Sequence, residues 1–251
     1  MRYKVTLAYD GSNYHGWQTQ RKGNSIEEKI EEALYRIHHR EVRIVGSGRT
    51  DARVHAKGQV FHFDSPLHLE AASMRTALNV QLSCDIRVQH VELVDAHFHA
   101  RFDACAKRYD FYLSSDVDNP FLRSYMAFER AKLDVDKMRE AACFFIGEHD
   151  FTSFTSAKID DRKDRIRHIT RLDIQQTNQC THFILEGNSF LRYMVRMIVQ
   201  TLIMVGKNKL KVDEVKTMLL AKNKHACQYK ADPQGLYLTS VTYKKTRDDK
   251  D

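Results

Sequence analysis

Several features that would mark a specialised protein class are scarce in this chain of 251 residues. It has 3 prolines and 10 glycines, too few for a flexible linker or a low-complexity tract. Its 5 cysteines are odd in number and scattered, and none is spaced as C-x-x-C. This usage argues against a disulfide framework and against a zinc site. We therefore expect free thiols in a reducing cytosol and a cytoplasmic protein.

A long hydrophobic run is also absent. The most apolar segment, 190–206, is interrupted by Arg192, Arg196 and Gln200, so we do not expect it to span a membrane. The N-terminal residues MRYKVTLAYD carry charges and alternate in polarity where a signal peptide requires an apolar stretch. The sequence therefore predicts a chain with no membrane partner.

Cofactor and metal signatures are missing as well. No G-x-x-x-x-G-K-[ST] loop and no G-x-G-x-x-G turn occurs, so a nucleotide cofactor has no support. His97 and His99 could share a strand face, and His38 and His39 are adjacent, but no carboxylate or cysteine has a helpful spacing to either pair. We expect no metal and no cofactor.

What the chain does have is a basic charge balance. Lysine and arginine number 40 against 33 acidic residues, which gives a formal net charge of +7. Such an excess is compatible with a polyanionic partner such as nucleic acid, although it also serves ordinary solubility. The hydrophobic content of 42% is sufficient for a packed core.

The polarity pattern predicts an α+β fold in two similar halves, residues 1–103 and 104–251. Most expected strands alternate in polarity, which favours antiparallel sheets with one open face. In the first half we expect strands at 3–9, 41–45, 59–63, 86–94 and 97–102, and helices at 26–37 and 69–79. In the second half we expect strands at 107–113, 169–176, 181–187 and 236–243, and helices at 134–145, 189–205 and 212–221.

Two short signals support individual elements. Ser25 and Glu28 have the spacing of a capping box at the start of the first helix. The Asn-Gln pair at 178–179 indicates a hairpin between the strands on either side of it.

The stretch GSGRTDARVH at 46–55 carries the first chemical candidate. Asp51 lies between Arg49 and Arg53 in a loop that begins with two glycines. Nearby cations keep a carboxylate ionised, and an ionised carboxylate can act as a nucleophile. An Asx-turn with a surface ion pair is the plainer explanation of the same residues.

The helix expected at 189–205 carries the second candidate. Arg192, Arg196 and Gln200 are spaced to share one face, and apolar residues surround Arg196. A buried arginine needs a partner, so Arg196 either reaches solvent or faces a carboxylate or a ligand phosphate. A narrow wet stripe on an amphipathic helix is the alternative.

Two further segments could contact RNA. In AKRYDFYL (106–113), Tyr109 could stack on a base while Lys107 and Arg108 hold phosphate, or it could pack in the core. The stretch 158–171 carries six basic residues against three aspartates, and could be a phosphate-binding surface or a solvated loop.

Taken in order, six segments resemble the tRNA pseudouridine synthase A family. They are YDGSNYHGWQ, GRTDARVH, HARFDACAKRY, DFTSFTSAK, GNSFLRYMVRMIV and ADPQGLYL, and together they span nearly the whole chain. The resemblance implies two ferredoxin-like or RRM-like halves joined across a central catalytic cleft. It also implies an isomerase that converts uridine to pseudouridine at positions 38, 39 and 40 of the tRNA anticodon stem-loop. Such enzymes need no metal or cofactor and act as homodimers.

The resemblance also assigns roles to residues. Asp51 is the catalytic aspartate, Arg49 helps to splay out the target nucleotide, Tyr109 lies near its base and Arg196 pairs with the aspartate. Whether the carboxylate attacks C1′, attacks C6 or promotes a glycal intermediate is left open. The residues expected to bind the substrate are Leu236, Leu238, Arg53, Lys107, Arg108 and Arg192.

Arg53 departs from the family, which usually has glycine there. If the backbone at this position has positive φ, a non-glycine residue costs about 1–2 kcal/mol, unless the loop has shifted. Asp232 stands where the family more often has proline, with little expected effect. A tRNA-binding protein with reduced or altered catalysis is therefore the alternative to an active synthase. A hydrolase with an aspartate nucleophile is a third hypothesis, weakened by the absence of a recognisable second carboxylate.

Overall fold

The computed structural model describes residues 1–21, 23–156 and 164–244. These residues form two compact units, each described below by itself. Unit 1 contains residues 1–105 together with 237–251, and unit 2 contains residues 106–236. The predicted division into two continuous halves did not include this return of the chain, which arises because the last strand pairs within unit 1.

Unit 1 is built on a mainly antiparallel sheet with the strand order β4-β1-β3-β10. The strands are β1 (Arg2–Tyr9), β2 (Val45–Gly46), β3 (His55–Asp64), β4 (Ile86–Val94) and β10 (Leu236–Tyr243). The short β2 pairs with β3 off this path, and β10 runs parallel to β3. Alternate residues of β1 are buried, as its alternating sequence predicts.

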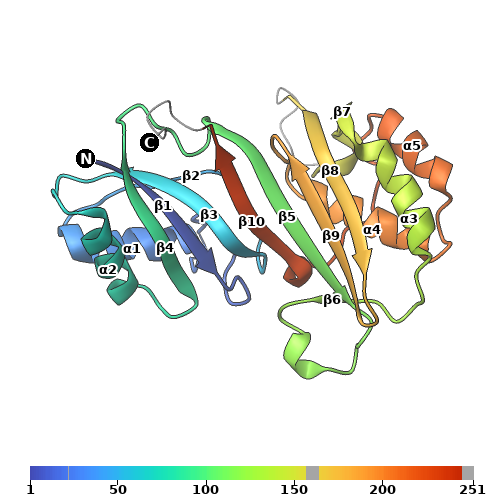
Figure 1. The fold of residues 1–251 in the computed structure, drawn as a ribbon, viewed down its shortest axis with the longest axis horizontal. Helices are drawn as coiled ribbons and strands as arrows, with labels where there is room; N and C mark the ends of the chain where they lie inside the picture. The colour runs from blue at the N-terminus through green and yellow to red at the C-terminus, as the bar shows by residue number, and fades with distance from the viewer. Residues whose placement is uncertain (22, 157–163, 245–251) are drawn as a thin grey trace, which may run out of the picture. The chain divides into compact units, whose positions relative to one another are not determined.

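Two helices, α1 (Ile26–His38) and α2 (Ala71–Gln81), pack on each other, and α2 contacts β4 (Figure 1). The predicted capping box is confirmed: the Ser25 hydroxyl accepts from the Glu28 amide, and the Glu28 carboxylate accepts from the Ser25 amide. Ile26, Ile30 and Leu34 form the buried stripe of α1. Helix α1 therefore begins at the position that the capping box predicts.

Strand β3 differs from the expected one-sided strand because it is buried on both faces from Gln59 to Phe63. Its polar members have partners: the Nδ1 atom of His62 accepts from the Ala100 amide at 3.1 Å. Burial lowers the pKa of His62 to about 4, which keeps that nitrogen unprotonated at neutral pH.

In unit 2 the strands pair antiparallel in the order β5-β9-β8-β7. Its strands are β5 (Ala104–Ser114), β6 (Ala127–Phe128), β7 (Gly147–Asp150), β8 (Ile166–Gln176) and β9 (Cys180–Gly187). Strand β6 pairs in parallel with the end of β5. The hairpin predicted from the Asn-Gln pair is confirmed, with residues 177–179 joining β8 to β9.

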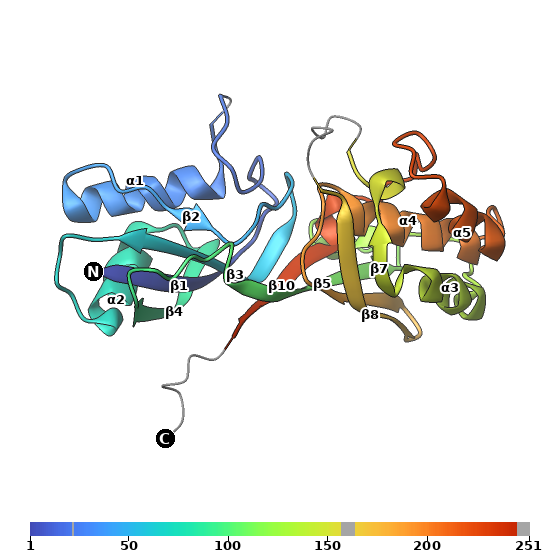
Figure 2. The ribbon, with the colours of Figure 1, turned by 90° about the horizontal axis from the view of Figure 1, so that it is seen from above.

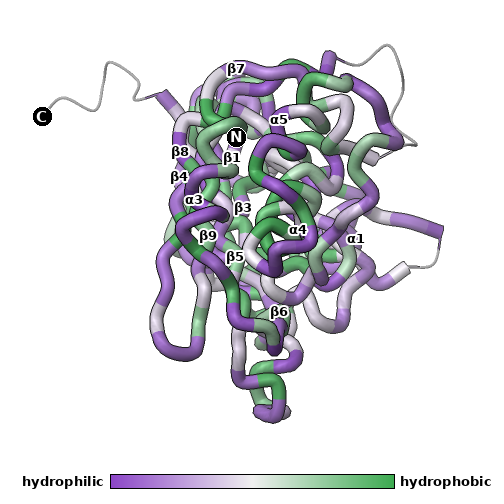
Figure 3. The backbone as a smooth tube through the Cα atoms, turned by 90° about the vertical axis from the view of Figure 1, so that its right-hand side faces the viewer, coloured by the Kyte–Doolittle hydropathy of each residue, from purple (hydrophilic) through white to green (hydrophobic). Residues whose placement is uncertain are grey.

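Three helices, α3 (Val135–Ala142), α4 (Met194–Gly206) and α5 (Val212–Leu220), gather beside β8 (Figure 2). Short 3₁₀ turns lie at Pro120–Leu122, Cys143–Phe145, Thr152–Phe154 and Pro233–Gly235. The segment before β6 contains the exposed apolar residues Phe121 and Tyr125. Coloured by hydropathy, the chain next to β6 has both hydrophobic and hydrophilic stretches (Figure 3). Within the described ranges, no helix has the length and apolar character to cross a membrane.

Three predicted elements are wrong or displaced. Residues 41–44 are not a strand, and only Val45 and Gly46 pair with β3. The strand expected at 97–102 is a turn, because the carboxylates of Asp95 and Asp103 accept from the amides of His97 and His99.

The helix expected at 189–205 is the third displaced element. It begins only at Met194, so Arg192 lies before it and does not share a helical face with Arg196. Residues 158–163 of the predicted basic stretch are outside the described part of the chain.

Candidate active site

The loop that holds Asp51 is fixed where it leaves β2. The Ser47 amide donates to the Val60 carbonyl at 2.7 Å, and the Ser47 hydroxyl donates to Oε1 of Gln59 at 2.7 Å. The Gln59 amide nitrogen donates to the Gly48 carbonyl at 3.1 Å. Ser47 and Gln59 are fully buried, so these bonds exchange no partner with water. A polar residue on a buried strand thus holds the start of the loop.

The residue before Asp51 is held just as closely. The Tyr9 hydroxyl and the Thr50 hydroxyl lie 2.8 Å apart, and the Trp17 amide donates to the Thr50 carbonyl at 3.1 Å. Burial raises the pKa of the Tyr9 phenol, which therefore keeps its proton at neutral pH. Strand β1 and the segment after it therefore hold the loop in position through Thr50.

Two glycines let the segment 11–17 lie against the loop. A Cβ on Gly11 would lie 2.0 Å from the Val54 carbonyl oxygen, and a Cβ on Gly16 would lie 2.7 Å from the Thr50 carbonyl oxygen. Gly16 also has a φ of +93°, a backbone conformation that favours glycine. The segments YDGSNYHGW and GRTDARVH therefore pack closely against each other and form one substructure.

Within this substructure Asp51 is half-buried, while Arg49 and Arg53 are exposed. The Asp51 carbonyl accepts from the Val54 amide at 3.2 Å, which closes a turn just after the aspartate. The main chain around Asp51 is thus bonded on both sides. A carboxylate held in this way is aimed by its backbone rather than by a long flexible stem.

Arg53 has a φ of +65°, in the left-handed region. Its amide donates to the Tyr14 carbonyl at 3.2 Å, and this bond keeps it in the matched substructure. The loop has therefore not moved to avoid the positive φ. Arg53 carries the strain that the sequence comparison with the family's glycine predicts.

Sequence reasoning missed His55, the first residue of β3. Its Nδ1 atom accepts from the Gly11 amide at 3.1 Å and lies 3.2 Å from a carboxylate oxygen of Asp10. Its ring stacks on Tyr237 with centroids 4.6 Å apart. The adjacent residue pair of β3 and β10 joins Ala56 to Leu238, which is almost completely buried. The sequence did contain a signal for His55. It ends the GRTDARVH segment, and its partners Asp10 and Gly11 lie in the YDGSNYHGWQ segment.

The remaining predicted site residues lie in unit 2. Tyr109 on β5 is buried and meets Phe190 edge to face, with centroids 5.1 Å apart. Lys107 is half-buried two positions earlier in the same strand. Arg108 donates to the buried Asp110 at 3.0 Å. Tyr109, Asp110 and Phe111 are all buried, so β5 does not alternate in burial at this point.

Arg196, in the first turn of α4, is buried to 8% exposure. Its Nε atom donates to the Ala231 carbonyl at 2.7 Å, and its own carbonyl accepts from the Ala231 amide at 3.0 Å. The guanidinium is therefore anchored to the segment that leads into the GLYL residues. Leu236 at the end of that segment is also buried.

A second residue that sequence reasoning missed is Tyr193. It precedes α4 in the left-handed conformation, and the guanidinium groups of Arg192 and Arg196 both lie over its ring. The sequence RYMVR gives the signal, an aromatic residue with basic neighbours one position before it and three after it.

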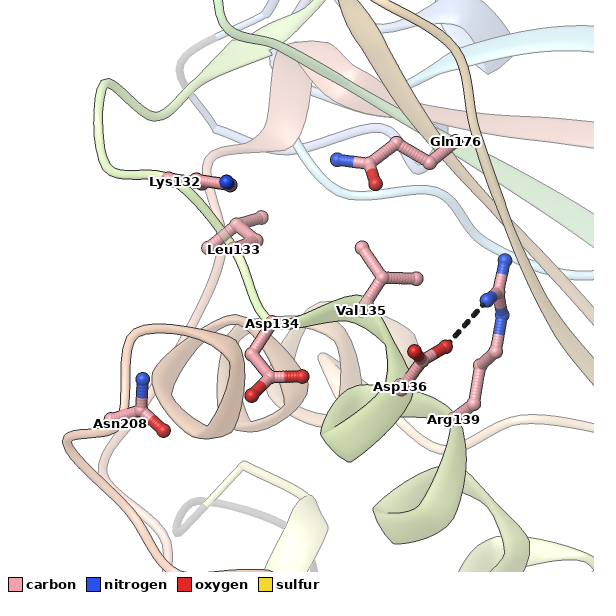
Figure 4. Close-up of a pocket in the computed structure, with 8 residues that line it drawn as sticks. All are labelled: Lys132, Leu133, Asp134, Val135, Asp136, Arg139, Gln176 and Asn208. Carbon is pink, nitrogen blue, oxygen red and sulfur yellow. Dashed lines mark hydrogen bonds and ion pairs between the residues drawn. The ribbon is translucent and has the colours of Figure 1, made fainter.

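A surface pocket of about 530 Å³ lies elsewhere in unit 2 and involves none of the predicted site residues (Figure 4). Asp136 and Arg139 in its wall form an ion pair at 2.9 Å, which leaves mixed and mostly compensated charge. In the part of the chain that the structure describes, no group of three or more side chains could hold a metal ion. The pocket carries no catalytic arrangement.

Comparisons with known proteins match both units. A family model described as tRNA pseudouridine synthase matches residues 6–103 and 141–244. The tRNA pseudouridine synthase A of Bacillus pumilus (strain SAFR-032) is 44% identical over 246 residues, 97% of this chain and 99% of the relative. That of Oceanobacillus iheyensis is 40% identical, covering 97% of each chain. The tRNA pseudouridine synthase A 1 of Protochlamydia amoebophila is 42% identical, covering 96% of each. With similarity of this extent, the chain belongs to the tRNA pseudouridine synthase family.

Proposed function

We propose that this protein isomerises uridine to pseudouridine at positions 38, 39 and 40 of the tRNA anticodon stem-loop, with Asp51 as its catalytic carboxylate. Family membership supports the reaction class. The observation that carries the assignment of Asp51 is its loop, in which main-chain bonds on both sides fix a half-buried carboxylate. Preorganisation of this kind is what a group acting on one atom of a substrate requires.

The reaction breaks the N1–C1′ bond of uridine, turns the uracil and rejoins it through C5. In each of the three open routes a single carboxylate does the work, either as a nucleophile at C1′ or C6 or as a base that promotes the glycal. The target nucleotide must first leave its stack, which costs a few kcal/mol. Arg49 and Arg53, both exposed beside Asp51, supply positive charge for the RNA backbone in this step.

The remaining groups of the proposal come from unit 2, except for Leu238, which belongs to unit 1. Arg196 is assigned as the cation that keeps the Asp51 carboxylate ionised, and Tyr109 as the aromatic neighbour of the target base. Leu236 and Leu238 are assigned to pack against that base, while Lys107, Arg108 and Arg192 are assigned to RNA binding. The anchoring of Arg196 to Ala231 supports its part, because a guanidinium tied through Nε keeps a defined direction.

A cytoplasmic homodimer is part of the same proposal and rests on the family resemblance. A tRNA-binding protein with reduced or altered activity stays the alternative. It is favoured by one observation, the strained backbone of Arg53 two residues after Asp51.

The test is release of tritium from unmodified tRNA labelled at uridine C5. We expect release from the intact protein and a loss of at least about a thousandfold in Asp51→Asn, since this variant keeps the shape of the side chain but removes its charge. tRNA binding should persist, because the loop is held by its main chain. Arg196→Ala should lower turnover more than tRNA binding.

Asp118→Asn is the matched control, since Asp118 forms an exposed ion pair with Arg130. It should release label like the intact protein. Full activity in Asp51→Asn would refute the assignment of the catalytic residue, and tight binding without release by the intact protein would favour the alternative. Mapping the modified uridines checks positions 38, 39 and 40.

A further inference from the structure

Three cationic side chains surround one aromatic ring in unit 2. The Lys230 ammonium lies 4.5 Å from the centroid of Tyr193, and the guanidinium carbons of Arg192 and Arg196 lie 4.7 and 5.6 Å from it. Cations within about 6 Å of a ring face are attracted by its quadrupole. Tyr193 is thus a shared platform for residues that are distant in sequence.

Backbone bonds hold the platform in place. The Arg192 carbonyl accepts from the Ser156 amide and the Thr155 hydroxyl, each at 3.2 Å. On the other side, the two bonds between Arg196 and Ala231 fix the residue that follows Lys230. The three cations are therefore brought together by the fold of unit 2 and not by flexible side chains alone.

Two of the three cations, those of Arg192 and Lys230, are not compensated by an acidic side chain among the described residues. Arg192 donates to the Tyr193 hydroxyl at 2.8 Å, and among the described residues no carboxylate forms an ion pair with Arg192 or Lys230. In the same unit, Arg108 and Arg171 each pair with an aspartate. Like charges held together repel one another, and an anion between them would relieve that repulsion.

We infer that Arg192, Lys230 and the Tyr193 hydroxyl form a clamp for one phosphodiester of the RNA substrate. This inference rests on the proposed function and adds Tyr193 and Lys230 to the residues that function uses. The guanidinium fork suits phosphate oxygens, the ammonium supplies a point charge, and the phenol adds a further hydrogen-bonding group. Arg192 and Lys230 are exposed, so the clamp is accessible in unit 2.

The test is the salt dependence of tRNA affinity. Lys230→Gln should weaken binding several-fold at low salt and reduce the slope of log affinity against log salt by about 0.7–0.9, the loss of one phosphate contact. Lys216→Gln is the matched control, because Lys216 is an exposed lysine that lies 5.8 Å from the centroid of Phe144. It should change neither quantity.

Two variants of the platform separate its parts. Tyr193→Phe keeps the ring and removes the hydroxyl, so it should weaken binding less than Tyr193→Leu, which removes both. Unchanged affinity and slope in Lys230→Gln, or an equal effect of Lys216→Gln, would overturn the clamp. If the intact protein releases label but the clamp variants bind normally, only the clamp is wrong. If the intact protein does not bind tRNA, the proposed function fails together with it.

Discussion

At the scale of single residues, Arg53 shows how backbone strain persists beside the proposed catalytic residue. Its φ of +65° lies where an L-residue other than glycine loses about 1–2 kcal/mol. The bond from its amide to Tyr14 keeps the conformation, and its side chain is exposed next to the proposed catalytic loop. An exposed arginine in this place exchanges some stability for positive charge beside the proposed catalytic loop.

Replacement of Arg53 separates backbone strain from charge. Arg53→Gly should be more stable than Arg53→Ala by about 1 kcal/mol, because both lose the side chain but only glycine accepts the positive φ freely. Thermal unfolding should show this as a difference of roughly 2–4 °C for a chain of this size. Equal stabilities would mean that the left-handed backbone is not strained. Both variants should bind tRNA more weakly than the intact protein if the charge contacts phosphate.

The sequence could indicate this residue but not its surroundings. The comparison of GRTDARVH with the family's glycine pointed to a positive φ, and the structure has one. In contrast, the local pattern RYMVR places Arg192 and Arg196 near Tyr193 but does not indicate Lys230, which meets the ring only through tertiary folding. The hydrophobic periodicity of a sequence indicates the structure of one element at a time, so it does not indicate contacts between distant segments.

At the scale of elements, the segment 11–17 acts as a template for the loop at 48–54. Gly16 allows a close approach, with the Thr50 carbonyl oxygen 2.7 Å from where a Cβ would lie. The Trp17 amide donates to that same carbonyl. The direction of Asp51 is consequently set by a neighbouring element as well as by its own turn.

Gly16→Ala tests the template. It should destabilise the protein by about 2–5 kcal/mol, from the positive φ and the clash together, and should reduce tritium release in the protein that remains folded. Gly23→Ala is its control: Gly23 has a φ of +66°, but its Cβ would meet only the Glu28 side chain at 3.6 Å. That variant should lose about 1–2 kcal/mol and keep its activity. Equal losses of activity in both would argue against the template.

Elements with strong local signals were predictable, and those set by side-chain bonds in a turn or by irregular backbone were not. The capping box located α1, and alternation located β4 and β10 at their observed bounds. Helix α4 was predicted to begin too early because residues 189–193 are compatible with a helix, whereas Tyr193 takes the left-handed conformation. The turn at 97–102 was mistaken for a strand because its aspartate bonds are not visible as a period.

At the scale of the whole molecule, unit 1 is completed by a strand from the end of the chain. Leu238 is almost fully buried, the Tyr243 hydroxyl donates to the Ala100 carbonyl at 2.7 Å, and Lys4 lies over the Tyr243 ring. Gly58 lets the strands approach, since a Cβ there would lie 2.5 Å from the Thr239 carbonyl oxygen. The last strand is therefore a packed part of unit 1.

Removal of residues 237–251 should destabilise unit 1 selectively. Burial of one leucine contributes about 2–5 kcal/mol, so the urea midpoint should fall by about 1 M or more. Fluorescence of Trp17, the only tryptophan and a buried residue of unit 1, reports this unit by itself. Full-length Thr242→Ala, which alters an exposed side chain of the same strand, should leave the midpoint unchanged. An unchanged midpoint in the truncated chain would contradict the packed role of β10.

The position of β10 also sets an order of events during synthesis. All of unit 2 leaves the ribosome before residue 237 does, and until then residues 1–105 lack strand β10. Unit 2 can therefore close on itself first, and the sheet that supports the Asp51 loop is finished only after β10 has been synthesised. A nascent chain stalled short of its final strand would be expected to lack the finished loop support, however long it had been given to fold.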